Sequence, residues 1–115
     1  MLTRTGDVWL APRVILLDLQ GNAYQPLLRG RPGTAGMRSG LVVLSPGESV
    51  GRHDTGAHEE QLVVLEGEGE FRVEGAEPLA INVATAVYCP PHRQHDVVNT
   101  GWGPLRYVYV VAEAR

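Results

Sequence analysis

The sequence predicts a single all-β domain, a sandwich or small barrel built from short strands. The chain has 115 residues, a length that fits one domain. Glycine and proline recur at short intervals between apolar runs rich in Val, Leu, Ile and Tyr, which is typical of strands joined by turns. Apolar residues do not repeat at three- and four-residue spacing over three turns, so we expect little or no helix.

Each predicted strand is a short apolar run bounded by turn residues. The runs are residues 8–10, 14–19, 40–44, 61–65, 70–73, 79–83, 86–88, 96–99 and 105–112. We expect 105–112 to be a central strand, because both of its alternating faces are largely apolar. Residues 20–39 are rich in glycine and proline and predict a long, mobile loop, with a short edge strand near residues 24–28.

Two turns predict β-hairpins. The sequence EGEG at 66–69 separates the run 61–65 from 70–73, and Gly75 separates 70–73 from 79–83. Glycine suits both turns because it adopts a positive φ without steric cost.

Charge and hydropathy exclude several classes of partner. Ten basic and thirteen acidic side chains give a net charge of -3, so we expect no nucleic-acid binding. The longest apolar run, residues 107–112, is far shorter than the roughly 18 residues of a membrane span, and we expect none. Pro12, Arg13 and Asp18 interrupt the apolar stretches near the start, so we expect no secretion signal. A single cysteine, Cys89, fits a reducing, cytoplasmic setting.

The histidines carry the clearest chemical signal. All four lie between positions 53 and 95. His58 and Glu60 begin a predicted strand and, being two residues apart, should share the face that Leu62 and Val64 continue into the core. A carboxylate on an apolar face needs a partner, and two or three imidazoles with one carboxylate suit a divalent first-row metal.

Two stretches of the chain resemble the motifs of the cupin family. The stretch PGESVGRHDTGAHEEQLVVLEG, beginning at Pro46, and the stretch PPHRQHDVVN, beginning at Pro90, match those motifs at Gly47, His53, Glu60, Gly67, Pro90, His95 and Asn99. The resemblance runs from about residue 41 to residue 111. It implies a double-stranded β-helix, a jelly-roll barrel, preceded by residues 1–40 as N-terminal strands and a Gly/Pro-rich loop.

The resemblance also implies a metal site. Its ligands would be His53, Glu60 and His95, around a divalent Fe, Mn, Ni or Zn ion. Thr55 stands where the family's first motif has its second histidine, and we hypothesise that His58 replaces that imidazole. The alternative is that the histidines are polar, hydrogen-bonded strand ends, with His58 an exposed turn residue.

Other side chains are assigned by their position. The pocket candidates are Thr55, Tyr88, Tyr107 and Tyr109, although such tyrosines more often fill a barrel core. Arg29, Arg31 and Arg38 flank the glycine-rich loop; we expect them to be solvated, the alternative being that one binds an anionic substrate. Asn99 should satisfy backbone groups, and Cys89 should be a small buried hydrophobe, the alternative being a thiol near a metal that is oxidised or acts as a distant ligand.

The sequence therefore favours a small metal-binding protein that acts on or binds a small molecule, and it leaves the catalytic residues unidentified. The resemblance to cupins allows dioxygenase- or isomerase-like chemistry. The alternative is a non-catalytic small-molecule-binding or sensor protein. The chain contains no lysine, which excludes a Schiff base formed by this chain. The resemblance further implies a homodimer in which residues 8–19 cross to the neighbour.

Overall fold

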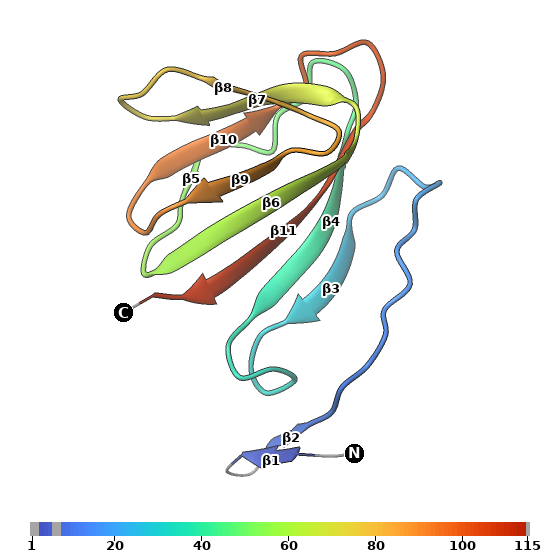
Figure 1. Ribbon diagram of the computed structural model, residues 1–115, viewed down its shortest axis with the longest axis vertical. Coiled ribbons are helices and arrows are strands. Elements are labelled where there is room, and N and C mark those ends of the chain that lie inside the picture. Colours follow the sequence, from blue (N-terminus) through green and yellow to red (C-terminus); the bar gives the residue numbers. More distant parts are fainter. Residues whose placement is uncertain (1–2, 6–7, 115) are drawn as a thin grey trace.

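The computed structural model describes residues 3–5 and 8–114, of which 3–5, 8 and 9 are described by their backbone only. A five-stranded antiparallel sheet has the order β3 (Gln25–Arg29), β4 (Arg38–Leu44), β11 (Leu105–Glu113), β6 (His58–Glu66), β9 (Ala86–Cys89) (Figure 1). A four-stranded antiparallel sheet has the order β5 (His53–Asp54), β10 (Gln94–Val98), β7 (Glu68–Val73), β8 (Leu79–Asn82). β1 (Thr3–Thr5) and β2 (Val8–Leu10) form a separate hairpin. The described residues form no helix, and therefore none that could span a membrane.

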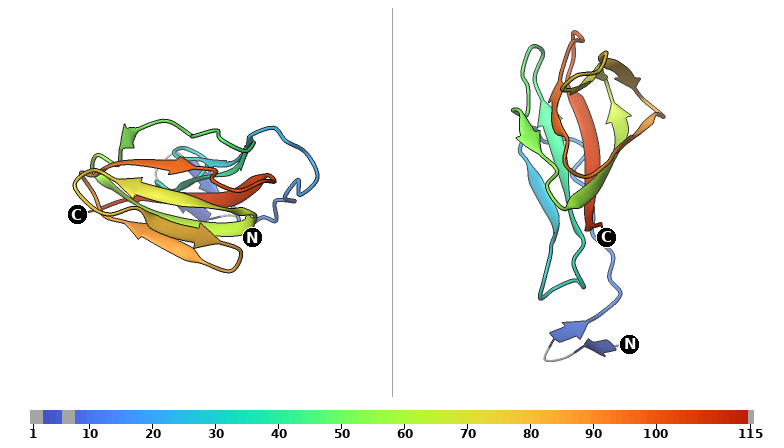
Figure 2. Two further views of the ribbon diagram at one scale, coloured as in Figure 1. Left: turned by 90° about the horizontal axis from the view of Figure 1, so that it is seen from above. Right: turned by 90° about the vertical axis from the view of Figure 1, so that its left-hand side faces the viewer.

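The two larger sheets share one core, as the predicted double-stranded β-helix requires (Figure 2). Its buried side chains come from both sheets: Val42, Leu44, Leu62, Val64, Phe71, Ile81, Val87, Cys89, Val97, Leu105 and Tyr107. The all-β prediction is confirmed, and Cys89 is part of this core.

The inner face of the five-stranded sheet is built in rows across the strands. β11 is its central strand, as predicted, and pairs with β4 on one side and β6 on the other. Tyr109 lies opposite Leu62 of β6, and Val111 lies opposite Glu60. The predicted alternation along β6 is therefore confirmed, because Glu60 occupies the face whose next members are core residues.

The segment before β4 differs from its prediction in two ways. Residues 14–19 are not a strand; they run extended with Val14 91% and Leu16 85% exposed. A local apolar run forms a strand only where a neighbouring strand accepts its hydrogen bonds, and this run pairs with none among the described residues. Residues 20–39 are not one long loop, because β3 and β4 pair there on either side of residues 30–37. β3 confirms the short edge strand.

Of the two predicted hairpins, one is wrong. β7 and β8 pair across Gly75, which has φ +80°, as predicted. β6 and β7, on either side of Gly67, lie in different sheets, so that turn is a corner. Gly67 has φ +86°, and an added Cβ would lie 2.2 Å from the Pro104 carbonyl oxygen. A glycine in the sequence predicts a residue with positive φ, and this backbone conformation occurs both in hairpin turns and where a chain crosses between sheets.

Asn99 fastens the loop that precedes β11, as predicted. Its side chain is 1% exposed; Nδ2 donates to the carbonyls of Leu44 (2.8 Å) and Gly103 (2.9 Å), and Oδ1 accepts from the Gly101 amide (2.9 Å). Replacing it leaves buried backbone groups without partners.

We expect Asn99→Ala to lower the free energy of unfolding by about 2–3 kcal/mol. Chemical denaturation measures this, with the exposed Asn22→Ala as the control. Equal stability of the two variants would contradict the proposed role of Asn99.

Candidate metal centre

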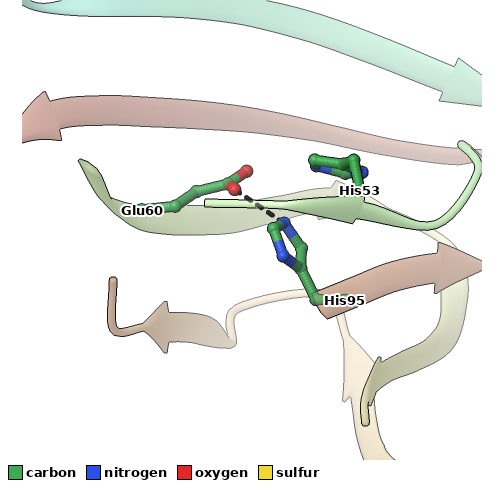
Figure 3. A group of neighbouring side chains, drawn as sticks. All are labelled: His53, Glu60 and His95. Atoms are coloured by element: carbon green, nitrogen blue, oxygen red, sulfur yellow. Dashed lines mark hydrogen bonds and ion pairs between the residues drawn. The ribbon is translucent and has the colours of Figure 1, made fainter. Parts of the chain in front are cut away.

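Three side chains from three strands converge between the sheets. His53 of β5, Glu60 of β6 and His95 of β10 place one ligand atom each within 4.8 Å of one another (Figure 3). His95 is 1% and Glu60 8% exposed, whereas His53 lies at the exposed side of the group. A cation bound there would have an accessible side.

Strand register explains the convergence. His95 and His53 are direct partners in the β10–β5 pairing, so their side chains leave the sheet on the same face. Their ring centroids are 4.0 Å apart. Phe71 of β7 packs against the His95 ring with the centroids 5.4 Å apart and the planes 18° from parallel, which restricts the orientation of the imidazole.

The hydrogen bonds of the two imidazoles determine which ring nitrogen of each can accept a cation. Nδ1 of His53 lies 2.8 Å from the Gly51 carbonyl, and Nδ1 of His95 lies 3.1 Å from the Arg93 carbonyl. A carbonyl only accepts, so each Nδ1 carries the proton and each neutral ring has its lone pair on Nε2. Metal-bound histidines commonly have this second hydrogen bond.

The contact between His95 and Glu60 points to a missing positive charge. Nε2 of His95 lies 2.9 Å from Oε1 of Glu60, and both atoms are acceptors when the ring is neutral. Two acceptors at this distance repel each other unless a proton or a metal ion lies between them. Burial by itself favours the neutral ring, but hydrogen bonds to Glu60 and to the Arg93 carbonyl outweigh it and raise the pKa of His95. These residues fit a divalent metal.

The other two residues of the first motif have different roles. His58 lines the cavity but lies outside the group of three, and its part as a further ligand stays a prediction. The Thr55 hydroxyl also faces this region, but it donates to the Pro90 carbonyl (2.8 Å) and accepts from the Arg93 amide (3.1 Å). Thr55 therefore fixes the loop that precedes His95.

Two of the three predicted tyrosines line the cavity. Tyr107 is 2% exposed and Tyr109 half-buried, and burial raises the pKa of both, so both stay protonated hydrogen-bond donors. The prediction for Tyr88 is wrong: it is 60% exposed and donates to Glu59 at 2.9 Å. Its strand partner is Gln61, on the outer face of β6.

The cavity has a volume of about 660 Å³, enough for a small molecule. Sequence reasoning missed Tyr24, whose hydroxyl lies 2.5 Å from that of Tyr109. The two residues are 85 positions apart, so no local signal joins them. Arg38 is exposed, as expected, and also lines the cavity.

Cys89 lies beside the site without being part of it. It is fully buried opposite Glu60 in the β6–β9 pairing, and burial raises the pKa of its thiol to about 11. It is therefore a neutral core thiol, which is the simpler of the two roles predicted for it.

A small all-β barrel with a histidine–carboxylate group between its sheets defines the class of this protein. The family model for the cupin domain matches residues 40–111, more than half of the chain. The chain belongs to the cupin family.

Solved structures agree with this fold. A Cupin 2 conserved barrel domain protein from Salinispora arenicola has 24% identity and a TM-score of 0.72, covering 90% of this chain and 91% of that one. An RmlC-like cupin family protein from Methanocaldococcus jannaschii has 20% identity and a TM-score of 0.72, covering 89% and 91%. A predicted oxalate decarboxylase from Thermotoga maritima has 20% identity and a TM-score of 0.64, covering 86% and 99%. A search of curated proteins found no significant match.

Proposed function

We propose that this cupin binds one divalent metal ion through His53, Glu60 and His95 and uses it to bind or transform a small molecule. The observation that carries the proposal is the facing pair of acceptors, His95 Nε2 and Glu60 Oε1, with a second imidazole within 4.8 Å. Two histidines and one carboxylate suit Fe, Mn, Ni or Zn and leave coordination positions open.

The metal ion and the side chains of the cavity would have different roles toward the small molecule. When bound, the metal would act as a Lewis acid and orient a substrate oxygen, or support redox chemistry if it is Fe or Mn. Tyr107 and Tyr109 would donate hydrogen bonds to substrate atoms in the cavity, because burial keeps both phenols protonated. Val42, Val97 and Val111 line its apolar wall.

The metal proposal is tested by elemental analysis of protein prepared without a polyhistidine tag. We expect about one equivalent of metal per chain and less than a tenth of that in His95→Ala. A wild-type protein that stays metal-free after incubation with each of the four ions in turn would refute the proposal.

His58→Ala tests whether His58 is a fourth ligand. A metal affinity within about threefold of wild type would show that the group of three suffices. A loss of more than about tenfold would show that His58 supplies the imidazole missing at Thr55.

Two activities are compatible with this site. We propose an oxidoreductase or isomerase. The alternative is a non-catalytic sensor, which is supported by the scarcity of free bases: of the cavity-lining carboxylates, Glu60 is a proposed metal ligand and Asp54 accepts a hydrogen bond from the Gly56 amide. Each metal should be added to metal-stripped protein while oxygen uptake is followed with diketones, catechols and thiols. Ligand affinity without turnover would identify the sensor.

We also propose that a second copy of the chain is the partner of the N-terminal segment. The β1–β2 hairpin lies beyond the barrel (Figure 1), and the segment leading from it exposes Val14 and Leu16. An isolated hairpin is marginally stable in water. Exposed apolar side chains that lie together mark a surface that is buried against another molecule. The outer face of the barrel offers Val63 and Leu65, which are 40% and 36% exposed.

We expect light scattering to give a dimer for the wild type and a monomer for the double variant Val14→Ser, Leu16→Ser. Trp102→Ser is the control and should stay dimeric. Trp102 is a large apolar side chain that is 98% exposed and lies outside the N-terminal segment. A monomeric wild type at micromolar concentration would contradict the dimer.

We further propose a reducing, cytoplasmic compartment. The support is that Cys89 is a buried free thiol and the chain has no second cysteine with which it could form an internal disulfide. Cell fractionation tests this, and recovery from a secreted fraction would contradict it.

A further inference from the structure

The wall of the cavity across the sheet from the candidate metal centre carries a second polar group. Arg38 of β4 and the tyrosine pair Tyr24–Tyr109 line the same cavity as His53 and Glu60. Of these three residues, the proposed function uses only Tyr109, as a hydrogen-bond donor, and gives Arg38 and Tyr24 no role. The cavity therefore carries polar groups at the Arg38 end of its wall as well as around the candidate metal centre.

Strand register fixes how these two places face each other. Arg38 is the partner of Val111 in the β4–β11 pairing, and Val111 is the partner of Glu60 in the β11–β6 pairing. Arg38 and Glu60 therefore occupy one row on the inner face, two strand spacings or about 9–10 Å apart at the backbone. Val111 stands between Arg38 and Glu60 in this row.

Arg38 has no acidic partner among the described residues. Two carboxylates on neighbouring strands of the same sheet are paired with other residues: Glu113 bonds Arg31 at 2.8 Å, and Glu60 bonds His95 at 2.9 Å. The aliphatic stem of Arg38 lies against Gly30, where an added Cβ would come 3.0 Å from Cγ. Within the part of the chain that the structure describes, Arg38 is thus an exposed cation without an acidic partner at the cavity wall.

The tyrosine pair adds a hydrogen-bond donor beside this cation. Its two hydroxyls share one hydrogen bond of 2.5 Å, which uses one of their two protons and leaves the other to donate. Gly40 makes room for the pair, because an added Cβ would lie 2.8 Å from the Tyr109 ring and closer still to the Tyr24 hydroxyl. A guanidinium beside a free hydroxyl donor recognises a carboxylate.

We propose that the cavity binds a small organic acid whose carboxylate is held by Arg38 and the Tyr24–Tyr109 pair. The gap of two strands, partly filled by the arginine side chain, leaves room for a chain of only a few carbons along the apolar wall. The far end of the ligand would carry a second oxygen group that reaches the metal position, a part of the inference that rests on the proposed function. The ligand class is therefore short dicarboxylates and hydroxy or oxo acids.

Succinate and malonate are the probes, with succinamide as the uncharged analogue, measured by calorimetry on metal-free and Zn²⁺-loaded protein. We expect both acids to bind, succinamide to bind at least tenfold more weakly, and Arg38→Gln to lose at least tenfold in affinity. Arg31→Gln removes the same charge from the Glu113 pair and should stay within twofold of wild type. Tyr24→Phe should weaken binding by a smaller factor than Arg38→Gln.

Three results would overturn the proposal: equal affinity for succinamide, equal losses in Arg38→Gln and Arg31→Gln, or tighter binding of inorganic phosphate than of either acid. Failure of the metal proposal is recognised separately. If metal-free protein binds succinate through Arg38 but takes up no metal, the carboxylate site stands and the metal site fails. If the protein holds one metal equivalent but binds neither acid, the metal site stands and the carboxylate site fails.

Discussion

Glu60→Gln is expected to lower the affinity for a divalent metal by about 100-fold or more. The change keeps the size of the side chain but removes the only charged ligand of the proposed group. Loss of an outer-sphere partner of a metal ligand already costs about 10–100-fold, so loss of the ligand's charge should cost at least the upper end of that range. Competition titration against a chelator of known affinity measures the effect.

Glu59→Gln is the matched control for this change. Glu59 is the adjacent residue and accepts from Tyr88 on the other side of the strand, away from the cavity. The wild type and this control should gain about 2.7 kcal/mol of stability at a metal concentration 100 times Kd, measured as a rise in Tm. Glu60→Gln should gain almost nothing at that concentration. Equal metal-induced rises in all three proteins would exclude Glu60 as a ligand.

Phe71→Ala is expected to lower the free energy of unfolding by about 3–5 kcal/mol, a large part of the 5–15 kcal/mol of a typical domain. Phe71 is fully buried between the sheets. The surrounding strands are held by their hydrogen-bond ladders and can fill the resulting cavity only partly. Urea denaturation measures the loss as a lower midpoint.

The same substitution should also weaken metal binding at temperatures where the variant is folded. The Phe71 ring packs on His95, so its removal allows the imidazole to reorient away from Glu60. Phe71→Leu is the control; it keeps most of the buried volume and should cost about 1–1.5 kcal/mol. A loss below about 1 kcal/mol in Phe71→Ala would show that this position is not a rigid part of the core.

The candidate metal centre was largely predictable from the sequence. Alternation along a strand is a local property, so the common face of Glu60 and Leu62 follows from their spacing alone. The cupin motifs then identified His53 and His95, which the structure brings next to each other as strand partners. The exposed position of Tyr88 was not predictable, because it depends on which residue of β9 lies opposite Glu60.

Pairing between strands is where sequence reasoning failed. Gly67 correctly marked a residue with positive φ, but the chain crosses there from one sheet to the other and does not form a hairpin. Residues 14–19 have the composition of a strand, yet none of the described strands forms a backbone ladder with them. Both errors have one cause: a strand is stabilised by a distant neighbour that a local pattern does not specify.

The sequence by itself determined the all-β class, the turns, the inward face of β6 and the three proposed metal ligands, because these depend on local backbone preferences and short motifs. Only the tertiary structure decided that Arg38 shares a row with Glu60 and that Tyr24 meets Tyr109. Those contacts join residues far apart in the chain through the registers of β4, β11 and β6. Register is chosen by packing of the whole core, and the proposed substrate class depends on it.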